Sequence, residues 1–322
     1  MKAIVCTKYG TPDVLRLQEA EKPVPKSNEV RIKVRAGTVG PSDCAFRKGD
    51  PLLVRFLYGF RKPKYSILGV ELAGEVESVG AGVASFKAGD RVFGLSTKMF
   101  GVYAEYVCLP ETAPLIVKPA GLTYEEAVAV CDGALTALTF LRDKAKVRSG
   151  QRVLINGASG AVGIYAVQLA KHFGAEVTGV CSAANAELVK TMGADRVIDY
   201  GKEDFTANGQ TYDVIFDAVG KRTYGQCKRA LTPKGIYLST VPSASILINM
   251  LRTAASGGRK AIFATAGLMQ NKENLAYISE LCDTGALRPV IDRRYPLEQT
   301  AEAHRYVDTG RKKGNVVIVI GG

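Results

Sequence analysis

The sequence has little of several residue types on which whole classes of protein depend. Its 322 residues contain no tryptophan and only two histidines, and its seven cysteines stand singly, with no C-x-x-C pair. We expect reduced, mostly buried thiols. No apolar run approaches the length of a bilayer span, and residues 1–5 enter a strand without the basic flank and long apolar core of a signal peptide. A cytoplasmic protein with no membrane partner is therefore expected.

The composition is that of a globular chain, with 47% hydrophobic and 23% charged residues, and the length allows two ordinary domains. The net charge of +12 invites a nucleic-acid interpretation, because Lys and Arg neutralise backbone phosphates. The basic residues are nevertheless spread along the chain, with modest clusters at residues 55–64, 288–294 and 311–313. A solvated basic surface is favoured over a nucleic-acid face. The cluster near residue 60 is a candidate for attracting an anionic cofactor or substrate into a cleft.

The most informative segment is residues 153–163, where an apolar strand runs into a glycine-rich turn that opens a helix. Such a turn brings backbone amides close to a diphosphate, and the helix dipole favours the negative charge. In the G-x-G-x-x-G frame the first glycine is replaced by Ala158. A structural turn without a ligand is the alternative interpretation. The predicted cofactor-binding residues here are Ala158, Ser159, Gly160, Ala161, Val162 and Gly163.

Short strands and helices alternate after this turn, and this order favours a doubly wound parallel sheet, the Rossmann form of an α/β fold. Before residue 110, short β-branched strands and glycine turns predict a β-rich domain with little helix. A helix is expected over residues 123–141 and one more strand over 316–320, which we expect to return to the first domain. The other expected strands are 29–35, 68–79, 90–93, 102–109, 151–155, 176–180, 196–198, 213–216, 235–240 and 261–266, and the expected helices are 164–173 and 185–192.

Five ordered segments together resemble the zinc-free quinone oxidoreductases, related to zeta-crystallin, of the medium-chain dehydrogenase/reductase superfamily. They are residues 40–50, 68–76, 89–94, 157–163 and 216–220. The resemblance implies a Rossmann domain over 122–286 inserted into a GroES-like catalytic domain over 1–121 and 287–322. It also implies hydride transfer from a nicotinamide cofactor in a cleft between the domains, and a homodimer or homotetramer.

The family's zinc ligands are missing at their usual positions. The first cysteine falls at Gly40, the histidine at Val70, and the last ligand near Asp132, next to Cys131. The two histidines, His172 and His304, do not stand at ligand spacing. No metal is therefore expected, and a zinc alcohol dehydrogenase with atypical ligands is the alternative.

Without zinc, an electrophilic substrate such as a quinone or an α,β-unsaturated carbonyl needs only a few hydrogen-bond donors to stabilise the negative charge on its oxygen. The candidate catalytic residues are Ser42 and Tyr58, with Arg55 as an electrostatic helper. The related reductases often carry Asn where this chain has Gly40 and Tyr where it has Ala45. Ordinary packing of Tyr58 and Arg55 in a surface loop is the alternative.

NADPH is the expected cofactor, because no carboxylate stands just after the second Rossmann strand to bind a ribose hydroxyl and repel a 2′-phosphate. Ser182 and Asn185 are the candidates for binding that phosphate, with Lys190 or Arg196 as helpers and Tyr200 near the adenine. Thr136, Asp217, Val219, Ser239, Thr240 and Asn315 complete the expected cofactor-binding set, the last five at the nicotinamide end.

The resemblance also leaves open a non-catalytic role, since zeta-crystallins serve as lens proteins or bind single-stranded RNA. The chain has only 8% aromatic residues, and no pattern of them suggests a platform for stacked bases. This alternative is disfavoured.

Overall fold

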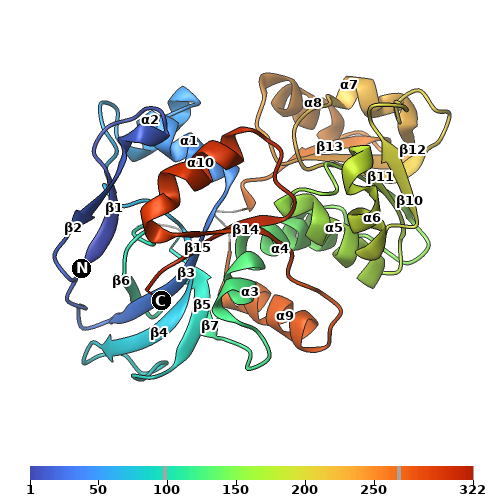
Figure 1. The fold of residues 1–322 in the computed structure, drawn as a ribbon. Coiled ribbons are helices and arrows are strands. Elements are labelled where there is room, and N and C mark those ends of the chain that lie inside the picture. The colour runs from blue at the N-terminus through green and yellow to red at the C-terminus, as the bar shows by residue number, and fades with distance from the viewer. Residues whose placement is uncertain (97–99, 267–269, 322) are drawn as a thin grey trace. The chain divides into compact units, whose positions relative to one another are not determined.

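The computed structural model describes residues 1–96, 100–266 and 270–321 (Figure 1). The chain forms two compact units. Unit 1 comprises Met1–Asp132, Gln270–Asp283 and Pro289–Gly322, and unit 2 comprises Gly133–Met269 and Thr284–Arg288. Within the described residues no helix is both long and apolar enough to cross a membrane.

Unit 2 contains a sheet of six parallel strands in the order β10-β9-β8-β11-β12-β13. This is the doubly wound order, with its reversal between β8 and β11, and ligands of such sheets bind beyond the carboxyl ends of the strands at that point. The strands are β8 Arg152–Asn156, β9 Glu176–Cys181, β10 Arg196–Asp199, β11 Tyr212–Asp217, β12 Leu231–Ser239 and β13 Lys260–Phe263. The helices are α5 Ala161–His172, α6 Ala186–Thr191, α7 Tyr224–Cys227 and α8 Ala244–Ala254, with 3-10 turns η3 Ala183–Asn185 and η4 Lys228–Ala230.

Unit 1 is built on the long strand β3 Glu29–Val39, which pairs antiparallel with β4 Glu71–Val79, β6 Tyr106–Pro110 and β15 Asn315–Val319. The last strand therefore lies beside β3 (Figure 1), which confirms the expected return of the chain to the first domain. The other strands are β1 Lys2–Cys6, β2 Leu15–Glu19, β5 Arg91–Leu95, β7 Leu115–Val117 and β14 Ile291–Pro296. The helices are α1 Pro41–Lys48, α2 Leu52–Tyr58, α3 Tyr124–Ala129, α9 Lys272–Asp283 and α10 Thr300–Asp308, with 3-10 turns η1 Pro12–Val14 and η6 Leu297–Gln299.

The predicted single helix over residues 123–141 is wrong in its continuity. Thr123 caps α3, which ends at Ala129, α4 runs over Cys131–Leu138, and a π-helical turn, η2, follows over Thr139–Lys144. In that turn the Ala145 amide donates to the Phe140 carbonyl, a step of five residues. The first 110 residues contain two short helices, α1 and α2, among their strands, in agreement with the expected β-rich domain with little helix.

The compact units assign residues 122–132 and 270–283 to unit 1. The reason is packing, because α3 contacts β3 and β4 while α9 contacts β7. The domain bounds inferred from the sequence, 121/122 and 286/287, describe sequence modules and stay a prediction.

Candidate functional site

The glycine turn leaves the carboxyl end of β8 and is fixed by backbone hydrogen bonds to the next strand. The amides of Gly157 and Ala158 both donate to the Val180 carbonyl at 3.0 Å, and the Gly160 amide donates to the Gly157 carbonyl at 3.0 Å. Gly157 has φ +81°, a left-handed conformation that favours glycine. The tight turn therefore depends on Gly157, one residue before Ala158, which is fully buried.

The three glycines of the turn are glycine for different structural reasons. A Cβ at Gly157 would lie 2.4 Å from Val219 Cγ1, and one at Gly163 would lie 2.1 Å from the Gly157 carbonyl oxygen. These two positions are glycine because the protein itself occupies the space. Gly160 differs, because it has φ −79° and a Cβ there would meet nothing closer than 3.4 Å. Space at Gly160 is what close approach of a diphosphate to the backbone requires.

The start of α5 has the features of an anion site. The first-turn amides of a helix, here those of Ala161, Val162 and Gly163, have no acceptor within the helix, and the dipole adds positive potential. Next to it, the side-chain Nδ2 of Asn185 donates to Ser159 Oγ at 2.9 Å, while Asn185 Oδ1 is buried with no hydrogen-bond partner. An open backbone cradle and an unpaired buried amide oxygen fit a dinucleotide at this edge of the sheet.

Ser182 and Tyr200 lie at the same edge as Asn185. Ser182 directly follows β9 and caps η3, and the Tyr200 amide donates to the Cys181 carbonyl at 3.1 Å. The Tyr200 side chain is 65% exposed, so its ring is free to cover a ligand. The structure thus brings together three residues that the sequence predicts on the adenine side.

The two cations predicted as helpers lie differently. Arg196 begins β10, at the opposite end of that strand from Tyr200, and pairs with Glu203 at 2.9 Å. Its predicted help at the carboxyl edge stays a prediction, because Glu203 itself donates its backbone amide to Asp199, the last residue of β10. Lys190, on α6, pairs with Glu187 at 3.5 Å. Sequence reasoning missed Asp199, which ends β10 in register with Cys181 and accepts the Gly201 amide at 3.0 Å.

Asp217 ends β11 and is fully buried among hydrogen-bond donors. Its carboxylate accepts from the Asn156 side chain at 3.0 Å and from Tyr237 Oη at 3.2 Å. It also accepts from the amides of Val219 at 3.3 Å and Arg222 at 2.8 Å. Asp217 therefore holds the loop that follows β11, and Val219, which packs on the glycine turn, is part of that loop.

The remaining predicted cofactor residues lie in both units. In unit 2, Thr240 follows β12 and its hydroxyl donates to the Ala218 carbonyl at 3.2 Å, while Ser239 Oγ donates to the Val241 carbonyl at 3.2 Å. Thr136 is buried on α4. Asn315, at the start of β15, belongs to unit 1, where its side chain donates to the Val290 carbonyl at 3.1 Å. The roles of these residues toward a cofactor stay predictions.

The predicted catalytic residues lie on two neighbouring helices of unit 1. Ser42 is exposed in the first turn of α1. Tyr58, on α2, packs edge-on against Phe46, with ring centroids 4.8 Å apart, and burial raises the pKa of its hydroxyl. Arg55 Nε donates to the Gly49 carbonyl at 3.0 Å. Both α2 residues therefore attach the helix to unit 1, and their catalytic role stays a prediction.

Sequence reasoning missed a cluster of ionisable side chains in unit 1, of which Asp43 and Glu71 are buried and Asp132 and Lys312 half-buried. Burial and the negative charge of Asp132 raise the pKa of Asp43 to about 7, although the Gly40 amide, 2.8 Å from Asp43 Oδ2, opposes this shift. Burial and the negative charges of Asp132 and Asp43 raise the pKa of Glu71. The Glu71 carboxylate accepts a hydrogen bond from the Asp132 backbone amide at 3.2 Å. Loss of water lowers the pKa of Lys312 to about 8. Asp43 and Lys312 can therefore hold or release a proton near neutral pH.

The cluster adjoins the positions that correspond to the family's zinc ligands. Asp43 follows Gly40 by three residues, and Glu71 follows Val70 directly. The signal in the sequence that points to it is the presence of both acids beside positions that lack a metal ligand. Among the residues that the structure describes, no group of three or more His, Cys, Asp or Glu side chains is arranged to hold a metal ion.

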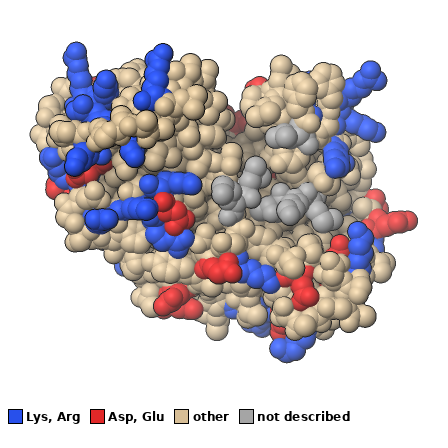
Figure 2. All heavy atoms as spheres, turned by 180° about the vertical axis from the view of Figure 1, so that it is seen from behind, with Lys and Arg blue, Asp and Glu red and all other residues tan. Residues whose placement is uncertain are grey.

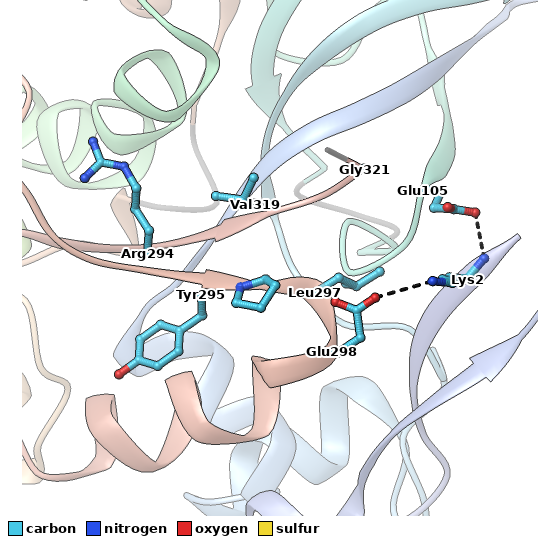
Figure 3. A pocket seen from close by; sticks show the side chains of 9 residues that line it. Lys2, Glu105, Arg294, Tyr295, Leu297, Glu298, Val319 and Gly321 are labelled. Carbon is cyan, nitrogen blue, oxygen red and sulfur yellow. Dashed lines mark hydrogen bonds and ion pairs between the residues drawn. The ribbon is translucent and has the colours of Figure 1, made fainter.

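A surface hollow of about 470 Å³ lies elsewhere in unit 1 (Figure 3). Its lining includes Lys2, Glu105, Arg294, Tyr295 and Glu298, and an ion pair of 3.6 Å joins Lys2 to Glu298. None of the predicted site residues lines it.

On the face shown in Figure 2, Lys and Arg side chains gather in several separate groups, with Asp and Glu between some of them. This arrangement agrees with the expected solvated basic surface on that face.

Comparison with known proteins places the chain in a family. Residues 26–120 match the family described as alcohol dehydrogenase GroES-like domain, and residues 192–318 match zinc-binding dehydrogenase. A 2-methylene-furan-3-one reductase of Solanum lycopersicum is 34% identical over 99% of this chain and 79% of its own length.

Two solved structures cover nearly the whole chain. The quinone oxidoreductase of Coxiella burnetii is 31% identical with a TM-score of 0.90, covering 100% of this chain and 99% of that one. The Escherichia coli quinone oxidoreductase complexed with NADPH is 26% identical with a TM-score of 0.85, covering 99% and 100%. With its six-stranded parallel sheet and GroES-like domain, the chain is an oxidoreductase that belongs to the quinone oxidoreductase family of the medium-chain dehydrogenase/reductases.

Proposed function

We propose that the protein transfers a hydride from NADPH to a quinone or an α,β-unsaturated carbonyl compound without the help of zinc. The observation that carries the cofactor choice is Ser182, a small hydroxyl residue at the end of β9 where NAD-specific enzymes place a carboxylate. Asn185 lies one 3-10 turn further on, and its side-chain NH₂ is a second hydrogen-bond donor at this edge. The related enzyme solved with NADPH supports this choice.

The residues of unit 2 would hold the cofactor in a defined way. The first-turn amides of α5 would bind the diphosphate across Gly160, while Ser182 and the Asn185 side-chain NH₂ would donate to the 2′-phosphate. Asp199 favours NADH, because its carboxylate stands at the end of the neighbouring strand β10, in register with Cys181. Bound in this way, the cofactor supplies the hydride, and the protein supplies binding and orientation.

The residues of unit 1 would stabilise the charge that develops on the substrate oxygen. Ser42 and Tyr58 are the proposed donors, and Arg55 contributes positive potential. The product needs one proton, and Asp43 and Lys312, with pKa values of about 7 and about 8, are the proposed proton sources. Zinc independence is supported by Gly40 and Val70, since neither side chain offers a donor atom to a metal.

A spectrophotometric screen tests the proposal by following consumption of NADPH and NADH with quinones, enones and simple aldehydes. We expect NADPH to be consumed with quinones or enones. Ser182→Asp should lower the ratio of kcat/KM for NADPH to kcat/KM for NADH by at least about tenfold, because the new carboxylate repels the 2′-phosphate. Ser245→Asp, on α8, is the matched control. Activity confined to aldehydes would contradict the substrate class.

Metal analysis of the purified protein separates the zinc-free proposal from a zinc alcohol dehydrogenase with atypical ligands, since stoichiometric zinc would overturn the former. A salt-titrated RNA-binding assay tests the non-catalytic alternative, because phosphate contacts weaken steeply with salt. A homodimer or homotetramer and a cytoplasmic location remain predictions that sedimentation and fractionation can test.

A further inference from the structure

Four large apolar side chains point outward from one short segment of unit 1. Leu52, Leu53 and Phe56 on α2 are 65%, 59% and 73% exposed, and Phe60, just after the helix, is 63% exposed. The rings of Phe56 and Phe60 contact each other, with centroids 5.7 Å apart. Single exposed apolar residues are ordinary, but a contiguous group of this kind marks an interaction site.

The opposite side of α2 packs against unit 1. The exposed apolar side is therefore not the side by which the helix joins the core of this unit. Tyr58 packs against Phe46 and also against Phe100, 5.3 Å away between ring centroids. Arg55 lies with its guanidinium 5.0 Å from the ring centroid of Tyr9, whose hydroxyl donates to the Gly59 carbonyl at 2.5 Å. These contacts attach both α2 and the residue that follows it to unit 1, and they leave Phe56 on the exposed side of the helix.

Positive charge borders this apolar group in the loop that follows the helix, while Arg55 lies on the inner side of α2. Residues 51–64 contain four cations, Arg55, Arg61, Lys62 and Lys64, and no acidic residue. The last three are exposed in the loop that directly follows the helix. Exposed Leu and Phe side chains bordered by Lys and Arg are the combination that binds a lipid interface, where apolar groups enter the acyl boundary and cations meet anionic headgroups.

We propose that α2 and residues 59–64 dock the protein on an anionic lipid surface. A second copy of the chain fits this patch less well, because self-association would bring its cations together. A nucleic acid would meet the cations but leave Leu52 and Leu53 without a partner. The docking goes beyond the proposed function and does not depend on which substrate the enzyme reduces.

Co-sedimentation of the full chain with vesicles tests the docking. One vesicle type is pure phosphatidylcholine, and the other is a mixture of phosphatidylcholine and phosphatidylglycerol, whose negative surface attracts Lys and Arg. We expect binding to the anionic vesicles that weakens with salt. Each cation contributes roughly fivefold to the partition, so R61E/K62E/K64E should lower binding at least about a hundredfold.

Matched variants separate the patch from net charge and general hydrophobicity. K202E/K228E/K234E changes the charge equally at exposed sites of unit 2. Leu52→Ser with Phe56→Ser should weaken the salt-resistant part of binding, whereas Val24→Ser, at a site 80% exposed, should not. All of these side chains are at the surface, and circular dichroism confirms the fold.

Three outcomes would overturn the proposal. Equal binding to neutral and anionic vesicles would remove the role of charge, and equal loss in the two triple variants would remove the role of this patch. Self-association of the wild type in sedimentation that Phe56→Ser abolishes would assign the patch to a second copy of the chain. Failure of vesicle binding leaves the reductase proposal untouched, since the latter is measured with soluble substrates in the absence of lipid.

Discussion

The Asn156 side chain donates a hydrogen bond of 3.0 Å to the Asp217 carboxylate and so joins the carboxyl ends of β8 and β11. The glycine turn leaves the sheet from the first of these strands, and the loop of Val219 leaves from the second. Both segments belong to the edge at which a doubly wound sheet binds its ligand. The buried Asp217 therefore acts on the cofactor edge through the loops it holds.

Replacing Asp217 by Asn should damage this edge. The NH₂ group of the new amide would face groups that themselves donate hydrogen bonds. In one orientation it faces the Asn156 side chain, and in the other it faces the Arg222 amide and the Tyr237 hydroxyl. We expect a loss of about 2–4 kcal/mol in the free energy of unfolding and at least about tenfold weaker NADPH binding. Urea denaturation and fluorescence titration measure the two effects.

Asp213→Asn is the control, because Asp213 lies near the other end of β11 and accepts the Arg152 amide at 2.9 Å. This variant should bind NADPH normally. Equal loss of affinity in both variants would show that Asp217 has no special role at the carboxyl edge.

Two alanine substitutions in the glycine turn should have different effects. At Gly163 the added Cβ would lie 2.1 Å from the Gly157 oxygen, so α5 must shift and stability should fall by about 1–3 kcal/mol. At Gly160 the backbone accepts alanine and the nearest atom is 3.4 Å away. Gly160→Ala should fold with a change of about 0.5 kcal/mol or less, yet bind NADPH at least about tenfold more weakly, because the methyl group fills the diphosphate's space. Unchanged affinity in a folded Gly160→Ala protein would contradict the cofactor assignment.

The sequence was most informative where a buried strand, a glycine turn and a helix follow one another directly. There the predicted strand over 151–155 differs from β8 by one residue at each end. The sheet order could also be inferred, since short alternating units allow few parallel arrangements. The helix α2 escaped prediction because its apolar residues point outward. Its pattern therefore lacks the polar outer face from which an amphipathic helix is recognised.

The site was predictable only in part, because its chemistry depends on residues far apart in the chain. Ser182, Asn185 and Tyr200 follow strand ends, and the sheet brings them together. The Asp43 cluster requires residues 43, 71, 132 and 312 to meet in space, and nothing in their spacing indicates that they do. The burial that shifts their pKa values is likewise a property of the fold.

Asp43 should make stability depend on pH. Because its pKa is raised from 3.8 to about 7, the folded state keeps a proton that the unfolded state has released over this range. The Asp43 contribution to the free energy of unfolding therefore falls as pH rises, by up to about 1.4 kcal/mol per pH unit, and is constant above pH 7. Burial lowers the pKa of His304 to about 3, so that its contribution has the opposite sign, rising with pH up to about 6.5.

The difference between wild type and Asp43→Asn isolates the Asp43 effect, because His304 is present in both. Asparagine can still accept the Gly40 amide that Asp43 accepts. We expect the stability advantage of the wild type over the variant to be larger at pH 5 than at pH 7. Urea denaturation at both pH values measures it, and a difference that is independent of pH would show that Asp43 titrates normally.

The buried Arg47 should make Asp308 a stability determinant of unit 1. Arg47 is fully buried and donates to Asp308 at 2.6 Å, while its Nε and Nη1 atoms have no hydrogen-bond partner. Lys48 pairs with the other Asp308 oxygen at 2.7 Å, but its side chain is 44% exposed. Asp308→Ala leaves the Arg47 charge buried without compensation, which costs about 3–5 kcal/mol. Lys48→Ala removes only a solvated partner and should cost about 1 kcal/mol or less. Chemical denaturation of the two variants decides the matter, because equal losses would mean that the charge of Arg47 is compensated by something other than Asp308.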